Sequence, residues 1–201
     1  MIIHIEFSIK KEKEEEGDSM KIRVGVSNRH IHLCKGDAEI LFGPGYEFTK
    51  RNDLSQIGEY ACEEVVKVST DNYEFPYVRV LGPIRNYTQV EVSMSDAIKL
   101  GINPPIRDSG DLENSESVWL EGPNGKIFKK NCCIRANRHI HCNKLDNIGH
   151  TNGDIVKVLS NDKIIDDVHI KENDSYVLEL HIDKDDALKY GLNTGDYIEL
   201  E

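Results

Sequence analysis

The chain has 201 residues, of which 38% are hydrophobic and 30% are charged, as expected of a soluble globular protein with one large or two small domains. Its 25 basic and 36 acidic residues give a net charge of −11, and no basic patch is present, which argues against nucleic-acid binding. No apolar run approaches the roughly 18 residues that span a bilayer, and no signal peptide is visible, so we expect no membrane association and a cytoplasmic location.

Residues 1–19 predict a tail that precedes the folded part of the chain. The segment KKEKEEEGDS is a charged run without core-forming side chains, and it favours a flexible extension. The segment MIIHIEFSI alternates apolar and polar residues, which is the period of a β-strand. We therefore predict either a flexible tail or an added edge strand.

Short strands dominate the pattern from residue 20 onward. Alternating apolar residues predict strands at 21–27, 63–69, 77–82, 88–94, 117–122, 154–160, 176–182 and 196–201. Three short helices are predicted at 36–41, 95–100 and 184–190, each with Asp or Ser near its start and Gly beyond its end. Many short strands with few helices favour a mainly β fold built from small barrels.

Two internal matches indicate a duplication. The pentapeptide NRHIH occurs at 28–32 and again at 137–141, so the second copy follows the first by 109 residues. VEVSMSDAIKLGI (90–102) also matches LHIDKDDALKYGL (180–192), and this alignment pairs Glu91 with His181. We predict two pseudo-symmetric β-barrels capped by short helices, one from residues 20–127 and one from 128–201.

The repeat also selects two sets of candidate metal ligands. Residues i and i+2 of a strand point to the same face, so each His-x-His pair presents two imidazoles together. A third ligand would leave an open coordination position, which is how catalytic zinc is held. A lone His-x-His is often only a pair of hydrogen-bonded, half-buried histidines, but two identical copies favour metal. The first set is His30, His32 and Glu91, and the second is His139, His141 and His181.

The cysteines and the arginines near the repeats are expected to have other roles. The five cysteines form no CxxC motif and their number is odd, which favours free thiols in a reducing compartment. Cys34 extends the first motif to His-x-His-x-Cys and is an alternative metal ligand or nucleophile, but Cys142 is out of register, which favours packing for both. Arg29 and Arg138 face away from the ligands and are expected to support them or to form structural ion pairs.

Longer motifs carry a resemblance to a known family. SNRHIHL, FGPGYEFT, DLSQIGEYACEE, VRVLGPIRNYTQVEVSMSDA, PPIRDSGDL and RHIHCNKLD resemble the phosphate propanoyltransferases (PduL-type phosphotransacylases), in order from about Arg23 to the C-terminus. The resemblance implies two β-barrels with a two-zinc active site between them. It also implies the reaction acyl-CoA + phosphate ⇌ acyl phosphate + CoA, with acetyl or propionyl as the acyl group.

Residue by residue, the resemblance places the family's metal ligands on the six residues chosen by the repeat. Arg85 matches the family's phosphate-binding arginine, and Ser109 matches a residue near the phosphate site. Val26, Ser27, Asn28 and Arg79 match positions associated with coenzyme A. The turn TDNYEFP replaces a basic turn of the family, and Leu188 replaces an Asn, so two contacts to the coenzyme differ.

We expect zinc-bound phosphate to attack the thioester directly in a ternary complex, because no Ser-His or Cys-His nucleophile signature occurs. One alternative is a zinc hydrolase that uses the same ligands, and another is a non-enzymatic, barrel-type regulator. The expected partners are acyl-CoA, phosphate and acyl phosphate, without nucleic acid or membrane. The sequence leaves open whether the chain forms a homo-oligomer. The family association adds the alternative of a cargo or shell component of a bacterial microcompartment, with its lumen as the location.

Overall fold

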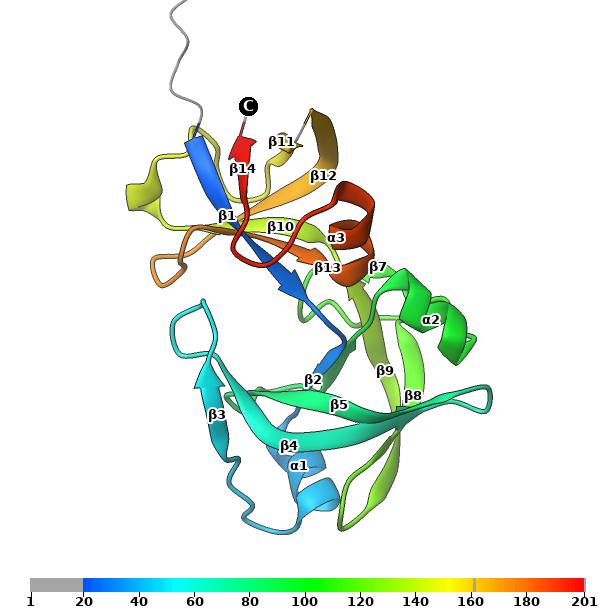
Figure 1. The fold of residues 1–201 in the computed structure, drawn as a ribbon. Helices are drawn as coiled ribbons and strands as arrows, with labels where there is room; N and C mark the ends of the chain where they lie inside the picture. The colour runs from blue at the N-terminus through cyan, green and yellow to red at the C-terminus, as the bar shows by residue number, and fades with distance from the viewer. Residues whose placement is uncertain (1–19, 161, 201) are drawn as a thin grey trace, which may run out of the picture.

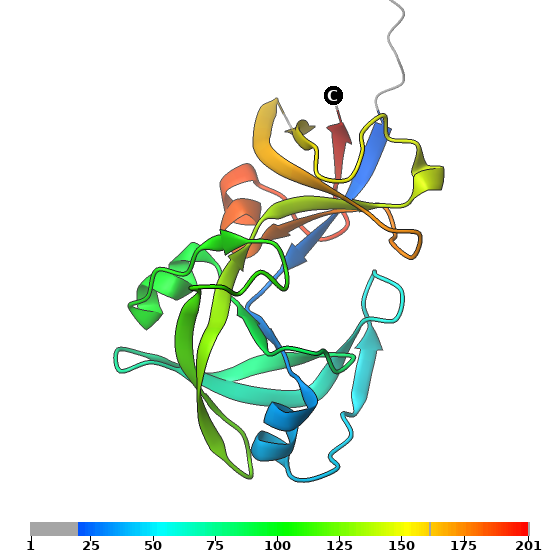
Figure 2. The same cartoon turned by 180° about the vertical axis from the view of Figure 1, so that it is seen from behind.

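The computed structural model describes residues 20–160 and 162–200, and the predicted tail at 1–19 lies outside them. Within this range the chain folds into two closed, six-stranded β-barrels that lie end to end (Figure 1). Three short α-helices pack on the outside of the barrels, as the view from behind also shows (Figure 2). The prediction of a mainly β fold with two small barrels and short helices is confirmed.

The first barrel has the strand order β4-β5-β2-β6-β9-β8, and β8 pairs again with β4 to close the ring. Its six strands are β2 (His30–His32), β4 (Tyr60–Ser69), β5 (Glu74–Gly82), β6 (Gln89–Glu91), β8 (Glu116–Glu121) and β9 (Lys126–Ala136). Two short strands extend the sheet, namely β3 (Lys50–Asp53) beside β4 and β7 (Ile106–Arg107) beside β9. The barrel interior is a single buried cluster of mostly Val, Leu, Ile and Cys side chains, which fixes the positions of the strands.

The second barrel has the order β1-β13-β10-β12-β11-β14 and closes by pairing β14 with β1. Its six strands are β1 (Met20–Ser27), β10 (Arg138–Cys142), β11 (Ile155–Ser160), β12 (Lys163–Glu172), β13 (Glu179–Asp183) and β14 (Tyr197–Leu200). A short 3₁₀ helix, Lys144–Asp146, follows β10. A second buried cluster, rich in Ile, Val and Leu, fills this barrel.

The three helices occur where the sequence predicts them: α1 (Lys35–Phe42), α2 (Met94–Leu100) and α3 (Lys184–Tyr190). The N-cap of α2 is Ser93 and that of α3 is Asp183, and each side chain accepts hydrogen bonds from backbone N–H groups of the first turn. Gly101 and Gly191 end these helices in the left-handed conformation. None of the helices in the described ranges has the length and apolar character needed to cross a membrane.

The chain crosses between the barrels twice, and this differs from the predicted division at residues 127 and 128. β1 belongs to the second barrel, where it pairs in parallel with β13, and the chain then crosses to β2 in the first barrel. β9 completes the first barrel, pairing in parallel with β6, and the chain crosses back to β10. The first strand of each sequence repeat therefore belongs to the barrel that the other repeat mainly forms. Each NRHIH segment lies at a crossing point.

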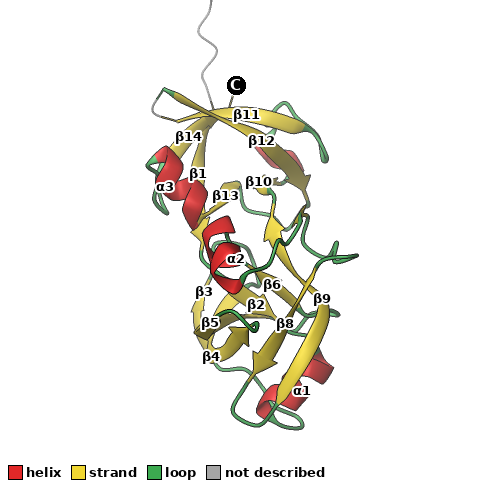
Figure 3. Ribbon diagram, turned by 90° about the vertical axis from the view of Figure 1, so that its right-hand side faces the viewer, coloured by secondary structure: helices red, strands yellow, loops and turns green. Residues whose placement is uncertain are grey.

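The N-terminal turns of α2 and α3 join the two barrels on one side (Figure 3). The carboxylate of Asp185 in α3 accepts hydrogen bonds from the backbone N and Oγ of Ser95 in α2, both at 2.7 Å. The fully buried side chain of Asp96 accepts from Arg29 at 3.1 Å and pairs with Lys184. These contacts hold the two barrels together.

Candidate active site

A cleft of about 1340 Å³ lies between the barrels, and side chains of both barrels line it. The crossing segments bring the NRHIH motifs into it from opposite directions, because each motif leaves one barrel and enters the other. Every residue predicted for the site lines this cleft: Val26, Ser27, Asn28, His30, His32, Arg79, Arg85, Glu91, Ser109, His139, His141 and His181. The structure thus brings the whole predicted site together.

The first ligand set lies on two antiparallel strands of the first barrel. His30 in β2 is directly opposite Glu91 in β6, so their side chains share a face of the sheet. Nε2 of His30 is 3.4 Å from Oε2 of Glu91, and the rings of His30 and His32 meet edge to face at 5.1 Å. One ligand atom from each of these three residues lies within 4.8 Å of the others.

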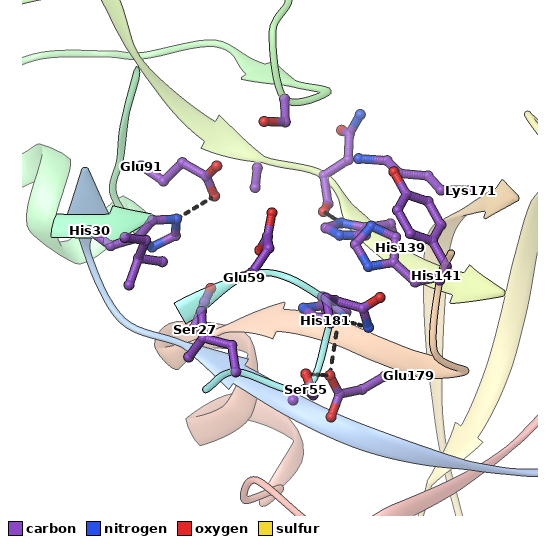
Figure 4. Close-up of a pocket in the computed structure, with 18 of the residues that line it drawn as sticks. Ser27, His30, Ser55, Glu59, Glu91, His139, His141, Lys171, Glu179 and His181 are labelled. Atoms are coloured by element: carbon purple, nitrogen blue, oxygen red, sulfur yellow. Dashed lines mark hydrogen bonds and ion pairs between the residues drawn. The ribbon is translucent and has the colours of Figure 1, made fainter. Parts of the chain in front are cut away.

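The second set repeats this geometry in the second barrel. His139 in β10 is directly opposite His181 in β13, and their rings stack with centroids 5.1 Å apart. The ring of His141 lies 4.6 Å from that of His139 and 4.7 Å from that of His181. Figure 4 shows these three rings grouped across the cleft from His30 and Glu91. Their ligand atoms also lie within 4.8 Å of one another.

Hydrogen bonds fix the first histidine of each pair in the same way. Nδ1 of His30 donates to the backbone oxygen of Asn28 at 2.8 Å, and Nδ1 of His139 donates to that of Asn137 at 2.7 Å. A neutral imidazole that donates from Nδ1 carries its lone pair on Nε2. Both rings are thus held in the tautomer that can ligate a cation through Nε2.

The remaining polar atoms of the site fit a divalent transition metal. Nδ1 of His32 and Nδ1 of His141 are buried and have no hydrogen-bond partner among the described residues. Burial lowers the pKa of His32 to about 2 and that of His141 to about 3, so both rings are neutral, as ligation requires. Burial alone would raise the pKa of Glu91, but the neighbouring His30 and the hydrogen bond from the Gln89 amide lower it, so Glu91 is ionised. Donor sets of two imidazoles with a carboxylate, and of three imidazoles, suit zinc.

Arg85 is held at three points beside the first ligand set. Its Nη2 donates to Glu59 at 2.8 Å, and its Nη1 donates to the Oγ of Ser109 at 3.0 Å and to the hydroxyl of Tyr87 at 3.4 Å. Its backbone N–H donates to Leu33, which fixes the segment between β5 and β6. A guanidinium presented in this way offers two adjacent donors to a planar or tetrahedral anion.

The residues predicted for coenzyme A lie at the first crossing and on β5. The backbone N–H of Val26 donates to the Oγ1 of Thr194 at 3.1 Å, and the Oγ of Ser27 donates to the backbone oxygen of Ile182 at 3.4 Å. Arg79 lies opposite His30 in the parallel pair β2–β5 and donates through Nη1 to the backbone oxygens of Cys62 and Glu63. Val26 and Ser27 therefore contact the second barrel, whereas Arg79 lies beside the first ligand set.

Cys34 and the two arginines before the histidine pairs take structural positions. Cys34 is the N-cap residue of α1, its Sγ accepts a hydrogen bond from Thr88 at 3.5 Å, and it is absent from the described residues that line the cleft. Arg29 pairs with Asp96. Arg138 forms a bidentate ion pair with Asp186, with Nε 2.7 Å from Oδ2 and Nη2 2.9 Å from Oδ1. The interpretation of both arginines as ion-pair residues is confirmed.

Several lining residues were missed by the sequence interpretation, and they come from the β3–β4 loop and from β12. Ser55 and Gln56 in the β3–β4 loop contact the second barrel, where Gln56 bonds both the N–H and the oxygen of Val177. Lys171 in β12 pairs with Asp108 in the first barrel at 3.0 Å. Figure 4 shows Glu59 of the same β3–β4 loop projecting into the cleft. No periodicity in the sequence marks these contacts, because they depend on how the loops fold.

Comparisons with known proteins agree on one family. Residues 23–193 match the family model described as phosphate propanoyltransferase. The chain is similar to proteins named phosphate propanoyltransferase from Thermotoga maritima (48% identical, covering 88% of this chain and 87% of the relative), Rhodopseudomonas palustris (44%, covering 70% and 63%) and Lachnoclostridium phytofermentans (42%, covering 81% and 78%). With the duplicated ligand sets and the arginine gathered in one cleft, these matches lead to a single conclusion: the chain belongs to the phosphate propanoyltransferase family and is an acyltransferase.

Proposed function

We propose that the cleft transfers a short acyl group, acetyl or propionyl, between coenzyme A and phosphate: acyl-CoA + phosphate ⇌ acyl phosphate + CoA. The observation that carries the proposal is Arg85, whose guanidinium is held inside the cleft that both ligand sets line. A hydrolase would need only water there, whereas a positioned guanidinium suits an oxyanion substrate. The names of the related proteins support the same reaction class.

We assign one zinc ion to His30, His32 and Glu91, and a second to His139, His141 and His181. When bound, these ions would act as Lewis acids that orient phosphate and stabilise negative charge on the thioester oxygen. The unpartnered ring nitrogens of His32 and His141 support this assignment, because buried polar atoms in native proteins nearly always have a partner.

Arg85 is the proposed phosphate-binding group, with Ser109 beside it. An incoming phosphate takes the place of the Glu59 carboxylate at Nη2, and the Oγ of Ser109 can donate a further hydrogen bond to it. Holding phosphate by two parallel N–H groups strips part of its hydration and fixes the direction of attack. Arg85 also lines the same cleft as both ligand sets, and we propose that it helps to stabilise the oxyanion that forms on the thioester carbonyl.

Coenzyme A is proposed to enter along Val26, Ser27 and Asn28, with Arg79 beside them. This places the thioester at the crossing segment, next to His30. Phosphate then attacks the carbonyl carbon directly, the carbon–sulfur bond breaks, and the thiolate of CoA leaves. Cys34 is not among the described residues that line the cleft, which supports direct attack without an acyl-enzyme.

The test is a thioester assay on the metal-loaded protein with acetyl-CoA and propionyl-CoA, with and without phosphate. We expect CoA release to require phosphate, and Arg85→Ala to lower kcat/KM by roughly 100- to 1000-fold, as for removal of other charge-stabilising donors. Arg51→Ala is the control, because Arg51 is an exposed arginine in a weak ion pair with Glu63 at 4.0 Å. Release of CoA without phosphate would indicate a hydrolase, and near-wild-type turnover by Arg85→Ala would refute the role of Arg85.

A further inference from the structure

Two buried polar side chains, Gln89 and Glu179, occupy equivalent positions in the two barrels. Each precedes the third ligand of its set by two residues, so it lies on the same strand face as Glu91 or His181. Gln89 pairs with His32 across the β2–β6 ladder, and Glu179 pairs with His141 across the β10–β13 ladder. Gln89 is 0% exposed and Glu179 is 2% exposed, so neither position can rely on water for its hydrogen bonds.

Gln89 donates to the ligand carboxylate of the first set. Its Nε2 lies 2.6 Å from Oε1 of Glu91 and 2.9 Å from Oγ of Ser109. Its Oε1 accepts the backbone N–H of Gly110 at 2.8 Å, which fixes the orientation of the amide. The N–H side of the amide must therefore face Glu91.

The carboxylate of Glu179 lies within ion-pair distance of the ligand imidazole of the second set, whose Nε2 is also 3.4 Å from the Nε2 of Gln56. Its Oε2 lies 3.1 Å from Nε2 of His181, and it also accepts a hydrogen bond from Ser55 of the opposite barrel. Arg23 lies 3.6 Å from its other oxygen. Gly25 gives this carboxylate its space, because a Cβ there would lie 3.0 Å from the Cδ of Glu179.

The residue two positions before the third ligand is thus a hydrogen-bond donor in the first barrel and an acceptor in the second. In each barrel this property matches the ligand beside it. A carboxylate ligand has an amide donor two residues before it, and an imidazole ligand has a carboxylate acceptor there. We propose that Gln89 and Glu179 are positioning residues, which hold Glu91 and His181 in the orientation that binds the two metal ions. This inference rests on the metal assignment of the proposed function.

Single substitutions test the proposal at each site separately. Glu179→Gln keeps the size of the side chain but removes the acceptor charge, so we expect metal affinity at the second site to fall by about 10- to 100-fold while the first site is unchanged. Native mass spectrometry counts the ions per chain, and titration with Co²⁺, followed by its absorption spectrum, gives the affinities. Glu199→Gln in β14 is the control, because its side chain forms no ion pair or hydrogen bond with the described residues. Unchanged affinity in Glu179→Gln would refute the proposal.

A double variant that restores metal binding separates a positioning role from a general effect on folding. His181→Glu alone sets two carboxylates side by side in a buried place, and we expect it to lose the second ion. Adding Glu179→Gln recreates the amide–carboxylate pair of the first barrel, and we expect the double variant to regain the ion. The reciprocal pair, Gln89→Glu with Glu91→His, tests the first barrel if the first pair fails to fold. A double variant that binds no better than the single one would overturn the inference.

The two proposals fail in distinguishable ways. A wild-type chain that binds two ions but releases no CoA with phosphate refutes the proposed function and leaves the positioning role standing. A wild-type chain with phosphate-dependent activity and unchanged metal affinity in the Glu179→Gln variant refutes only the positioning role. A wild-type chain that binds no metal ion refutes both the metal assignment and the positioning role.

Discussion

Replacing Asp96 by Asn is expected to loosen the contact between the two barrels on the side of α2 and α3. The carboxylate of Asp96 is fully buried and joins Arg29, at the first crossing, to Lys184 in α3. Arg29 and Lys184 both donate to Oδ1 of Asp96, so the amide oxygen of Asn can still face both cations, but the substitution removes the negative charge that pairs with them. The backbone N–H of residue 96, which donates to the Oγ of Ser93, is unaffected.

The size of the effect follows from the exposure of the partners. A hydrogen bond to a charged group contributes about 1.5–3 kcal/mol, and Asp96 accepts two of them. The side chains of Arg29 and Lys184 are 33% and 26% exposed, so water recovers part of this contribution. We therefore expect a loss of about 2–3 kcal/mol in the free energy of unfolding, or about 5–10 °C in Tm for a chain of this length.

Urea unfolding followed by circular dichroism measures this loss, with the thermal midpoint as a second readout. The matched control is Asp111→Asn, because Asp111 forms an exposed ion pair with Arg107 four residues before it, with side chains 47% and 42% exposed. We expect at most about 0.5 kcal/mol there. A loss in Asp96→Asn no larger than that of the control would refute the view that this buried carboxylate holds the barrels together.

Three further predictions concern the metal, the packing of a hairpin and the one accessible thiol. Removing metal with a chelator should abolish phosphate-dependent CoA release, and zinc should restore it; activity in demonstrably metal-free protein would contradict the ligand assignment. Gly122→Ala should lower the free energy of unfolding in urea by about 1–3 kcal/mol, because the added Cβ would clash with the backbone oxygen of Leu41. Gly36→Ala in α1, where no atom lies within 4 Å, should instead stabilise by up to about 1 kcal/mol, and equal effects would contradict this reasoning. The kcat of the Cys34→Ala variant in the thioester assay should lie within about threefold of the wild-type value, whereas a tenfold loss would implicate the thiol in the reaction.

The local pattern of the sequence predicted the helices and most strands, but it did not predict two long strands. β9 and β12 each contain one residue in the left-handed conformation, Asn131 with φ 50° and Asp167 with φ 55°. Such a residue bulges the strand and shifts which side chains face inward. The alternation of apolar and polar residues is therefore interrupted within both strands, and periodicity alone cannot detect them.

The duplication selected both candidate ligand sets, because each His-x-His pair and each third ligand lies in a matched local sequence, although the two matches have different offsets of 109 and 90 residues. The same alignment, extended two residues back from Glu91 and His181, pairs Gln89 with Glu179, and this signal could have found both buried residues. The contacts that Ser55 and Lys171 make with the opposite barrel have no counterpart in the repeat. They arise from the approach of one barrel to the other, which no local pattern encodes.

The exchange of β1 and β9 between the barrels has a consequence for how such a site could arise. A chain with one repeat cannot close its own ring, so it would have to lend its first strand to an identical copy and borrow one in return. In such a symmetric pair both metal-binding triads would carry the same third side chain. When the two copies are fused in one chain, the third side chain of each triad can change independently. In this chain one triad has a glutamate and the other a histidine.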